Sequence, residues 1–279
     1  MRKDKAKNME NIVQNHNLEI IRLPAFEDNY LWLIAKNGNA WVVDPGDAAV
    51  VRAGLTAHHL KLCGILLTHH HADHTGGVPA LLAAQPDLAV IAPFLDNIKG
   101  LPAHAQDAHT FHQNKQQVFL TGISCSVSVI PVPGHTLGHV AYVLEDETCE
   151  LKETHLFCGD TLFAAGCGRV FEGTFAQMFD SLKSLAALPH SVANDTLVYC
   201  AHEYTLANLV FAMAVEPENT AMKERYEACK AMRAVGLATV PFKLSGELAT
   251  NPYLRCESVE RFAEIRAWKN NFSPPQPNP

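Results

Sequence analysis

The chain lacks any long uninterrupted hydrophobic stretch. No segment reaches the ~18 uncharged apolar residues that a membrane-spanning helix requires. The first residues, Met1–Asn17, are polar and rich in lysine, and they lack the apolar core of a secretion signal. We therefore expect neither a membrane partner nor secretion.

An excess of positive charge is also missing. The 22 Lys and Arg residues are outnumbered by 29 Asp and Glu residues, which gives a formal net charge of −7. A chain of this kind has no general attraction for polyanions, which argues against a nucleic-acid partner. The eight cysteines form no C-x-x-C pair, a pattern typical of a reduced cytoplasmic protein. We expect a cytoplasmic monomer that acts on a small molecule.

The hydrophobic pattern divides the chain into three parts. Residues 1–17 form a polar extension, and residues 18–195 alternate short apolar runs with segments of helical spacing. Residues 196–279 contain one more strand followed by helices, and Gly236–Pro252 is predicted to be a connection between the last two helices. The predicted strands are Leu18–Leu23, Tyr30–Ala35, Ala40–Val43, Leu62–Leu67, Leu88–Ala92, Ile123–Val132, Val140–Leu144 and Thr196–Cys200. The predicted helices are Ala48–His58, Gly77–Gln85, Phe175–Leu188, Leu206–Val215, Ala221–Val235 and Val259–Asn270. This order predicts an α/β domain followed by a helical domain.

Histidine is unusually frequent: the chain has 15, and four of them lie in the segment Thr68–His74. This segment follows the apolar run Gly64–Leu67, which predicts a buried strand that ends at the rim of a sheet. In an extended loop His69 and His71 point to the same side, while Asp73 and the last histidine face a neighbouring point. Imidazole and carboxylate groups suit zinc, iron or manganese. The alternative is a solvated histidine-rich loop, which has no reason to follow a buried strand.

Three later segments repeat this order of an apolar run followed by a potential ligand. They end in His135, Asp160 and His202. Each of these residues alone is more often a turn residue or a satisfied core residue than a metal ligand. Together with the first loop they supply five histidines and two aspartates, which suffice for two metal ions that share one carboxylate.

Five short motifs, in this order along the chain, resemble those of a known family: T-H-x-H-x-D-H, G-H-T-x-G-H, G-D-T-L-F, A-G-C-G-R and H-E-Y-T. The set is similar to glyoxalase II, the hydroxyacylglutathione hydrolase branch of the metallo-β-lactamase superfamily. The first motif identifies only the superfamily, whereas A-G-C-G-R and H-E-Y-T indicate the branch. The resemblance implies an αββα metallo-β-lactamase sandwich with a C-terminal helical domain that completes the substrate site.

The resemblance also implies a ligand set made of two triads and a shared carboxylate. One metal ion would be held by His69, His71 and His135, the other by Asp73, His74 and His202, with Asp160 bridging both. The family is usually described with zinc, although iron and manganese also occur in it, so two zinc ions per chain are expected. Asp73 and Asp160 would take part in catalysis together with a hydroxide that bridges the two metals.

The implied activity is hydrolysis of S-D-lactoylglutathione, and of related S-2-hydroxyacylglutathiones, to glutathione and D-lactate, the second step of methylglyoxal detoxification. A thiolate is a good leaving group because its thiol has a pKa of only ~8.5, so no general acid is required. The residues that match the family's substrate contacts are Arg169, Phe171, Tyr204, Arg266 and Lys269. Phe171 stands where many relatives have tyrosine, so one hydroxyl donor is absent.

Two other functions fit part of this pattern. A sulfur dioxygenase or lactonase of the same superfamily would share the first ligand loop, but a dioxygenase uses a single iron and leaves the second triad superfluous. A protein that binds metal only to stabilise its loops is expected to use closed, cysteine-rich sites. The histidine and aspartate ligands therefore favour a hydrolase with two metals.

Overall fold

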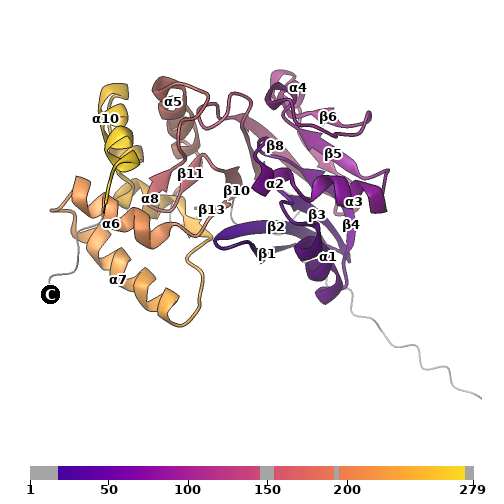
Figure 1. Cartoon of the computed structure of the whole chain (residues 1–279), viewed down its shortest axis with the longest axis horizontal. Helices are drawn as coiled ribbons and strands as arrows, with labels where there is room; N and C mark the ends of the chain where they lie inside the picture. Colours follow the sequence, from indigo (N-terminus) through magenta and orange to yellow (C-terminus); the bar gives the residue numbers. More distant parts are fainter. Residues whose placement is uncertain (1–17, 145–153, 192–194, 274–279) are drawn as a thin grey trace, which may run out of the picture.

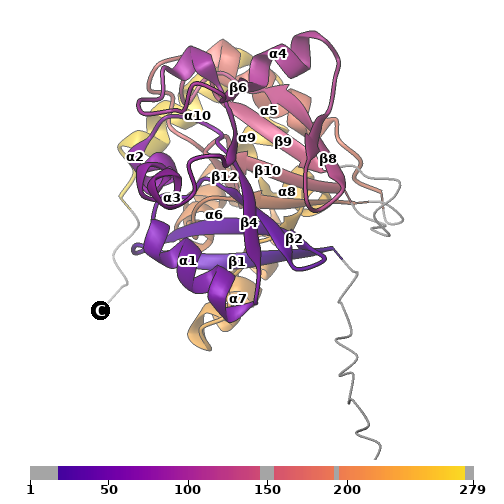
Figure 2. The ribbon, with the colours of Figure 1, turned by 90° about the vertical axis from the view of Figure 1, so that its right-hand side faces the viewer.

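Residues 18–144, 154–191 and 195–273 are described by the computed structural model, and they form a four-layered molecule (Figures 1 and 2). Two six-stranded sheets face each other, with helices on the outside, and the C-terminal helices lie at one end of the sandwich. The predicted αββα class is confirmed. The polar extension 1–17 lies outside the described residues.

The first sheet has the strand order β1-β2-β3-β4-β5-β6. Helices α1 (Ala48–Ala57) and α3 (Val78–Ala84) follow β3 and β4 and pack on its outer face. On β2, Trp32 belongs to the core between the sheets and the neighbouring Leu33 to the core beneath the helices. Alternate side chains of a strand point to opposite faces, so a strand that is apolar throughout is buried on both. The strands are β1 (Glu19–Ala25), β2 (Asn29–Lys36), β3 (Asn39–Val43), β4 (Lys61–Leu66), β5 (Ala89–Ala92) and β6 (Gln106–Asp107).

The second sheet has the order β14-β13-β10-β9-β8-β7. Its parallel pair, β10 and β13, is connected through helix α5 (Phe175–Ala186), whose Met178 and Leu182 enter the main core. A short hairpin of two strands, β11 (Leu162–Phe163) and β12 (Gly166–Cys167), lies between β10 and α5 in the chain. The strands of the sheet are β7 (Val118–Leu120), β8 (Cys125–Pro131), β9 (Val140–Leu144), β10 (Thr154–Gly159), β13 (Thr196–Cys200) and β14 (Phe242–Lys243).

The C-terminal part is not made only of helices and loops. The segment Gly236–Pro252, predicted as a plain connection, contains strand β14 and helix α8, and α9 begins at its end. Buried Phe242 of β14 pairs with Val198 of β13, but two residues are too few to give a strand pattern in the sequence. The helices are α6 (Thr205–Val215), α7 (Thr220–Ala234), α8 (Leu244–Thr250), α9 (Pro252–Arg255) and α10 (Val259–Asn270).

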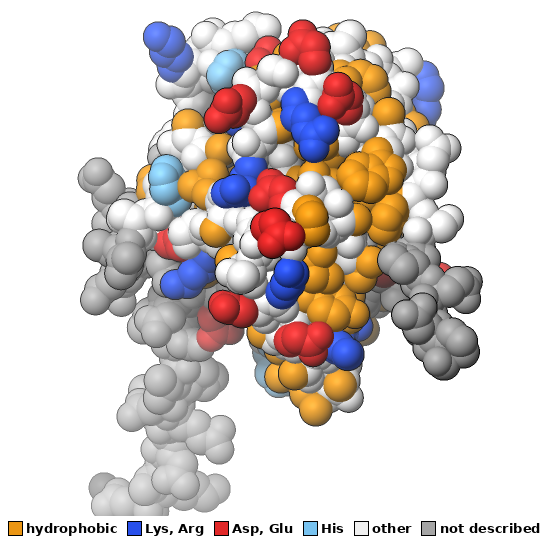
Figure 3. Space-filling model, turned by 90° about the vertical axis from the view of Figure 1, so that its left-hand side faces the viewer, with side chains coloured by type: hydrophobic (Ala, Val, Ile, Leu, Met, Phe, Trp, Pro, Cys, Tyr) orange, Lys and Arg blue, Asp and Glu red, His pale blue; other side chains and the backbone are white. Residues whose placement is uncertain are grey.

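Most of the longer predicted elements are found within two or three residues of their expected ends, whereas the short ones were not predicted. Besides β14, α8 and α9, the unpredicted elements are α2 (Ala72–Thr75), the 3₁₀ turn η1 (Phe94–Asp96), α4 (Ala108–Gln113), β6, β7 and the β11–β12 hairpin. Among the described residues, no helix is long and apolar enough to cross a membrane, and no disulfide joins the cysteines at positions 63, 158, 167, 200, 229 and 256. On the face formed by the C-terminal helices, acidic and basic side chains are interspersed beside an apolar band (Figure 3).

Candidate metal centre and substrate site

Four loops bring the candidate ligands together at one edge of the sandwich. The first follows β4 and carries the four clustered histidines, and the second joins β8 to β9 and carries His135. The third and fourth follow the parallel strands β10 and β13 and carry Asp160 and His202. Because the carboxyl ends of parallel strands meet at one edge of a sheet, residues distant in sequence become neighbours there.

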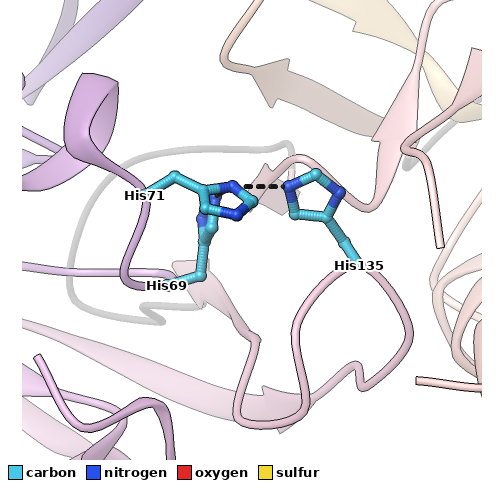
Figure 4. A group of neighbouring side chains, drawn as sticks. All are labelled: His69, His71 and His135. Atoms are coloured by element: carbon cyan, nitrogen blue, oxygen red, sulfur yellow. Dashed lines mark hydrogen bonds between the residues drawn. The ribbon is translucent and has the colours of Figure 1, made fainter. Parts of the chain in front are cut away.

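His69, His71 and His135 form the first cluster. Nδ1 of His71 lies 3.0 Å from Nε2 of His69 and 2.9 Å from Nε2 of His135. The three rings approach one another from two loops, with their nitrogens directed to a common point (Figure 4). One nitrogen from each ring can therefore reach the same ion.

Asp73, His74 and His202 form the second cluster. Oδ2 of Asp73 lies 3.5 Å from Nε2 of His74 and 3.4 Å from Nε2 of His202. Asp73 and His74 belong to the short helix α2, which turns them away from the first two histidines. Asn29 Nδ2 donates a hydrogen bond of 2.9 Å to the same Asp73 oxygen and fixes its orientation.

Asp160 lies between the two clusters. Its Oδ2 is 3.4 Å from His135 Nε2, whereas its Oδ1 is 3.5 Å from His74 Nε2 and 3.4 Å from His202 Nε2. Each carboxylate oxygen thus faces a different cluster, which is the arrangement expected of a bridging ligand.

The polar atoms of this centre fit a pair of cations. His74 Nε2 and Asp160 Oδ1 are buried and make no hydrogen bond, an arrangement that costs free energy unless another group meets them. Nitrogen and carboxylate donors at these spacings suit zinc, iron and manganese alike. Together with the fold, the clusters imply a site for two metal ions.

The outer ring nitrogens of the histidines are bound to the protein. His74 Nδ1 lies 2.9 Å from Asp44 Oδ2, and His202 Nδ1 lies 2.9 Å from Asp28 Oδ1. His135 Nδ1 lies 2.8 Å from the carbonyl oxygen of Arg169. Because a hydrogen-bond acceptor faces Nδ1 of each ring, the proton of the neutral imidazole lies on Nδ1. The lone pair of Nε2 is then free and points into the cluster.

The outer nitrogen of His69 also has a partner within the protein, and this contact connects the two clusters. His69 Nδ1 lies 3.0 Å from the hydroxyl of Thr68, which donates to Asp44 Oδ2 at 2.7 Å. The same carboxylate therefore supports one histidine of each cluster, His69 through Thr68 and His74 directly. Asp44 is 4% exposed, so this support is shielded from water.

The electrostatics of the centre favour positive charge. Burial alone would raise the pKa of Asp160, but His74 and His202 hold it well below its usual value. Burial opposes protonation of His202, yet Asp160 and Asp73 raise its pKa to about 10. Burial and the surrounding histidines lower the pKa of His69 well below its usual value, so this ring is neutral and its free nitrogen could bind a metal ion. The carboxylates of Asp73 and Asp160 therefore favour positive charge beside them, and bound cations would supply it.

Two further histidines of the ligand motifs take other positions. His139 stacks on His69 with ring centroids 4.6 Å apart, and its Nε2 accepts a hydrogen bond of 3.2 Å from the backbone N–H of Asp160. His70 turns away from the clusters and lies 3.3 Å from both Asp96 and Glu172. Neither residue belongs to the ligand set that the family resemblance implies.

Three supporting residues were not identified from the sequence: Asp28, Asn29 as a partner of Asp73, and Asp96. Asp96 is 8% exposed and accepts hydrogen bonds from the backbone N–H of His70 and the hydroxyl of Thr136, so it joins two ligand loops. Asp28 and Asp96 lie in short turns, and Asn29 is the first residue of β2, so no periodic pattern indicates any of the three as a partner of the clusters. No sequence signal other than the family resemblance could have found them.

Among the predicted substrate residues, Tyr204 and Phe171 flank the clusters. The Tyr204 ring stacks on His202 at 4.7 Å, nearly parallel to it. Phe171 is 60% exposed, and its ring lies 5.3 Å from that of His135. Arg169 is exposed, and its charge opposes the rise in the pKa of Tyr204 that burial causes, which places the two side chains near each other.

Arg266 and Lys269 lie farther out, on α10. Arg266 is only 4% exposed, and its guanidinium donates to the carbonyl oxygen of Cys167 at 2.9 Å and to Asn270 Oδ1 at 3.0 Å. Lys269 Nζ donates to the carbonyl oxygen of Ala207 at 3.2 Å, and burial, together with the charge of Arg266, lowers its pKa to about 8. Arg266 is thus engaged within the protein, whereas Lys269 retains partial access to solvent.

Comparisons with known proteins agree with this geometry. Residues 26–202 match the family model of the metallo-β-lactamase superfamily, and residues 203–272 match that of the hydroxyacylglutathione hydrolase C-terminus. The chain is 52% identical to the hydroxyacylglutathione hydrolase of Dechloromonas aromatica, over 91% of this chain and all of the relative. It is 45% identical to that of Photobacterium profundum, with the same coverage.

Solved structures are similar in fold. A metallo-β-lactamase from Staphylococcus aureus has a TM-score of 0.63 at 18% identity, covering 95% of this chain and 76% of the other. ETHE1 from Myxococcus xanthus has a TM-score of 0.58 at 23% identity, covering 90% and 89%. At these identities the likeness concerns the fold alone, whereas the sequence relatives are far closer. The chain belongs to the hydroxyacylglutathione hydrolase family, a branch of hydrolases within the metallo-β-lactamase superfamily.

Proposed function

We propose that the protein hydrolyses the thioester of S-D-lactoylglutathione, and of related S-2-hydroxyacylglutathiones, to glutathione and the free hydroxy acid. This reaction is the second step of methylglyoxal detoxification. The single observation that carries the proposal is the position of Asp160, whose two carboxylate oxygens face two different ligand clusters. The 52% and 45% identical relatives that bear this activity in their names support the same substrate class.

The proposed ligand set is unchanged from that implied by the motifs. His69, His71 and His135 would hold one ion, and Asp73, His74 and His202 the other, with Asp160 shared. Zinc is the proposed metal, and iron and manganese suit the same donors. When bound, the two ions would supply a hydroxide nucleophile near neutral pH and stabilise the negative charge that develops on the carbonyl oxygen.

The residues of the chain have separate tasks in this reaction. Asp73 and Asp160 balance the charge of the centre, and the hydrogen bond from Asn29 keeps Asp73 in place. The partners of the outer histidine nitrogens keep the ligands oriented while the acyl group reacts. The departing thiolate needs no proton at the moment of cleavage, because its thiol has a pKa of only ~8.5. The absence of a dedicated acid in the proposed mechanism therefore agrees with a thioester substrate.

Glutathione carries carboxylates, which cationic side chains would bind. Arg169 beside Tyr204, and Lys269 with Arg266 on α10, are the proposed cationic contacts. Phe171 adds an apolar surface next to His71 and His135, in place of the hydroxyl of a tyrosine. All seven proposed metal ligands come from one chain, which supports action as a monomer. The proposed place of action is the cytoplasm, on a small substrate.

A kinetic comparison on one purified preparation tests the proposal. Turnover of S-D-lactoylglutathione is measured beside that of a simple ester and a lactone, and metal content per chain is determined on the same sample. We expect two metal ions per chain and a kcat/KM for the thioester at least about 100-fold above that for the other substrates. Equal rates on all three substrates would refute the proposed specificity. One iron ion per chain together with oxygen uptake would indicate that the protein is a dioxygenase and not a hydrolase.

A further inference from the structure

The short β11–β12 hairpin connects two groups of the metal centre. Asp160, whose carboxylate lies between the clusters, precedes the hairpin by two residues. Arg169 follows it by two residues, and its carbonyl oxygen accepts the hydrogen bond of His135 Nδ1. The position of the hairpin therefore determines where the shared carboxylate and one ligand of the first cluster lie.

The backbone that follows the hairpin packs directly against the backbone of Asp160. Gly168 N donates a hydrogen bond of 3.2 Å to the carbonyl oxygen of Thr161. A Cβ atom at Gly168 would lie only 1.8 Å from the carbonyl oxygen of Asp160, so no side chain fits at this position. A shift of the hairpin would consequently displace the backbone of Asp160 as well.

The backbone of the hairpin is held by polar side chains from the C-terminal helices. Four residues on or next to α6, α8 and α10 make these contacts, at distances of 2.8–3.3 Å. Asn208 donates to Ala164 O, Asn251 donates to Phe163 O and Gly166 O, Arg266 donates to Cys167 O, and Glu247 accepts from Ala165 N. Every residue from 163 to 167 is thus bound through its backbone to the helical region.

These contacts are buried and hold a constrained conformation. Glu247 and Asn251 are 0% exposed, and Asn251 donates to Glu247 Oε2 at 2.9 Å. Ala165, whose N–H donates to Glu247 Oε2, has a φ of 54°, in the left-handed region that alanine rarely adopts. Arg225 forms an ion pair with the other oxygen of Glu247. Such a conformation persists only where the surrounding structure determines it.

We propose that the C-terminal helical region is part of the scaffold of the metal centre, and that Asn251 and Glu247 are positioning residues for Asp160. The region would then set metal affinity in addition to contacting substrate. The physical reason is that the buried helical side chains fix the hairpin backbone, and the hairpin in turn fixes Asp160 and the carbonyl partner of His135. This inference rests on the proposed metal centre, and it gives the A-G-C-G-R motif a structural role.

A pair of matched substitutions, Asn251→Ser and Asn219→Ser, tests the proposal. Asn251 and Asn219 are both N-cap residues in the C-terminal region, Asn251 for α9 and Asn219 for α7, and both also donate to a backbone carbonyl. Serine retains a capping oxygen in each case. Only the change at 251 removes contacts to the hairpin.

Zinc affinity is measured by competition with a chromophoric chelator, without substrate, and the Co²⁺-loaded proteins are compared by their absorption spectra. Thermal unfolding of the metal-free proteins shows whether each variant folds. We expect Asn251→Ser to raise the zinc dissociation constant at least about tenfold over Asn219→Ser and to alter the cobalt spectrum. If Asn251→Ser does not fold, Asn208→Ala, which removes only the bond to Ala164, is compared with Asn219→Ser in its place.

The outcomes separate this inference from the proposed function. Zinc affinities and cobalt spectra that are the same in both variants would overturn the role of the helical region while leaving the metal centre intact. A wild-type chain that binds no zinc would overturn the proposed metal centre, and this inference with it. Weaker zinc binding in Asn251→Ser than in Asn219→Ser, with thermal unfolding of both variants like that of the wild type, supports the proposal.

Discussion

The ligand clusters and the surrounding substrate residues are held in different ways. His74 is 1% exposed and His69 0%, and the outer nitrogen of each ring has a partner within the protein. Phe171, by contrast, is 60% exposed, and Arg169 is also exposed. The fold therefore fixes the geometry of the ligand clusters, whereas Phe171 and Arg169, two of the proposed glutathione contacts, can be exchanged at little structural cost.

The largest effect is expected when the carboxylate of Asp160, which faces both ligand clusters, is removed. Asp160→Ala should lower kcat by at least about 10³-fold, because both clusters lose an oxygen and the charge of the centre is no longer balanced. Steady-state kinetics with metal analysis is the measurement. Asp107→Ala, which removes the N-cap of α4, serves as the control. Undiminished hydrolysis in Asp160→Ala would show that this residue does not bridge the clusters.

A smaller loss is expected when only the support of a ligand is removed. Asp28→Ala deletes the partner of His202 Nδ1, so metal affinity at the second cluster should fall about 10- to 100-fold while the first cluster is less affected. Titration of the metal-free protein with zinc can resolve the two sites. Exposed Asp87 offers a matched control as Asp87→Ala. Similar affinities in the two variants would argue against a role of Asp28 in orienting His202.

At the substrate residues the expected effect is on KM. Lys269→Ala should raise KM for S-D-lactoylglutathione about tenfold with little change in kcat, because the ammonium group is remote from the reacting carbonyl.

The same lysine predicts a pH dependence. Burial lowers the pKa of Lys269 to about 8, so the free enzyme loses this positive charge as the pH rises through that value. Wild-type kcat/KM should therefore decline above about pH 8, and Lys269→Arg, which stays charged, should retain it. A pH profile that is identical in wild type and Lys269→Arg would exclude this titration as the cause of the decline.

The smallest effect concerns the aromatic residue next to the first cluster. Phe171→Tyr restores a hydroxyl donor and should lower KM about two- to fivefold, the worth of one hydrogen bond at an exposed position. Phe94→Tyr, at another exposed phenylalanine, should change nothing. An unchanged KM in Phe171→Tyr would indicate that glutathione does not reach this residue.

The candidate ligands could be predicted from the sequence because each one follows a buried strand. Apolar runs before His69, His135, Asp160 and His202 determine where these side chains emerge, and strand topology then brings them together. The histidine and aspartate composition indicates metal without any knowledge of the fold. The long strands and helices were predictable for the same reason, since their periodicity extends over many residues.

The residues that support the candidate ligands could not be predicted, because their contacts are tertiary and leave no periodic pattern in the sequence. Asp28 and Asp96 are single carboxylates in short turns, and only the folded chain brings them to His202 and His70. Arg266 is a proposed glutathione contact from its place in a motif, and no sequence pattern indicates that its buried guanidinium also donates to the carbonyl oxygen of Cys167. The sequence indicates which residues are polar or charged, whereas their partners follow from packing.

Strand β14 also determines where this chain can be divided. It covers the outer edge of β13, although it belongs to the segment that leads into the last helices. A fragment that ended at His202 would leave the backbone of β13 without that neighbour, and an uncovered apolar edge strand invites aggregation. Exchange of helical domains between relatives should therefore carry residues 242–243 along with the helices.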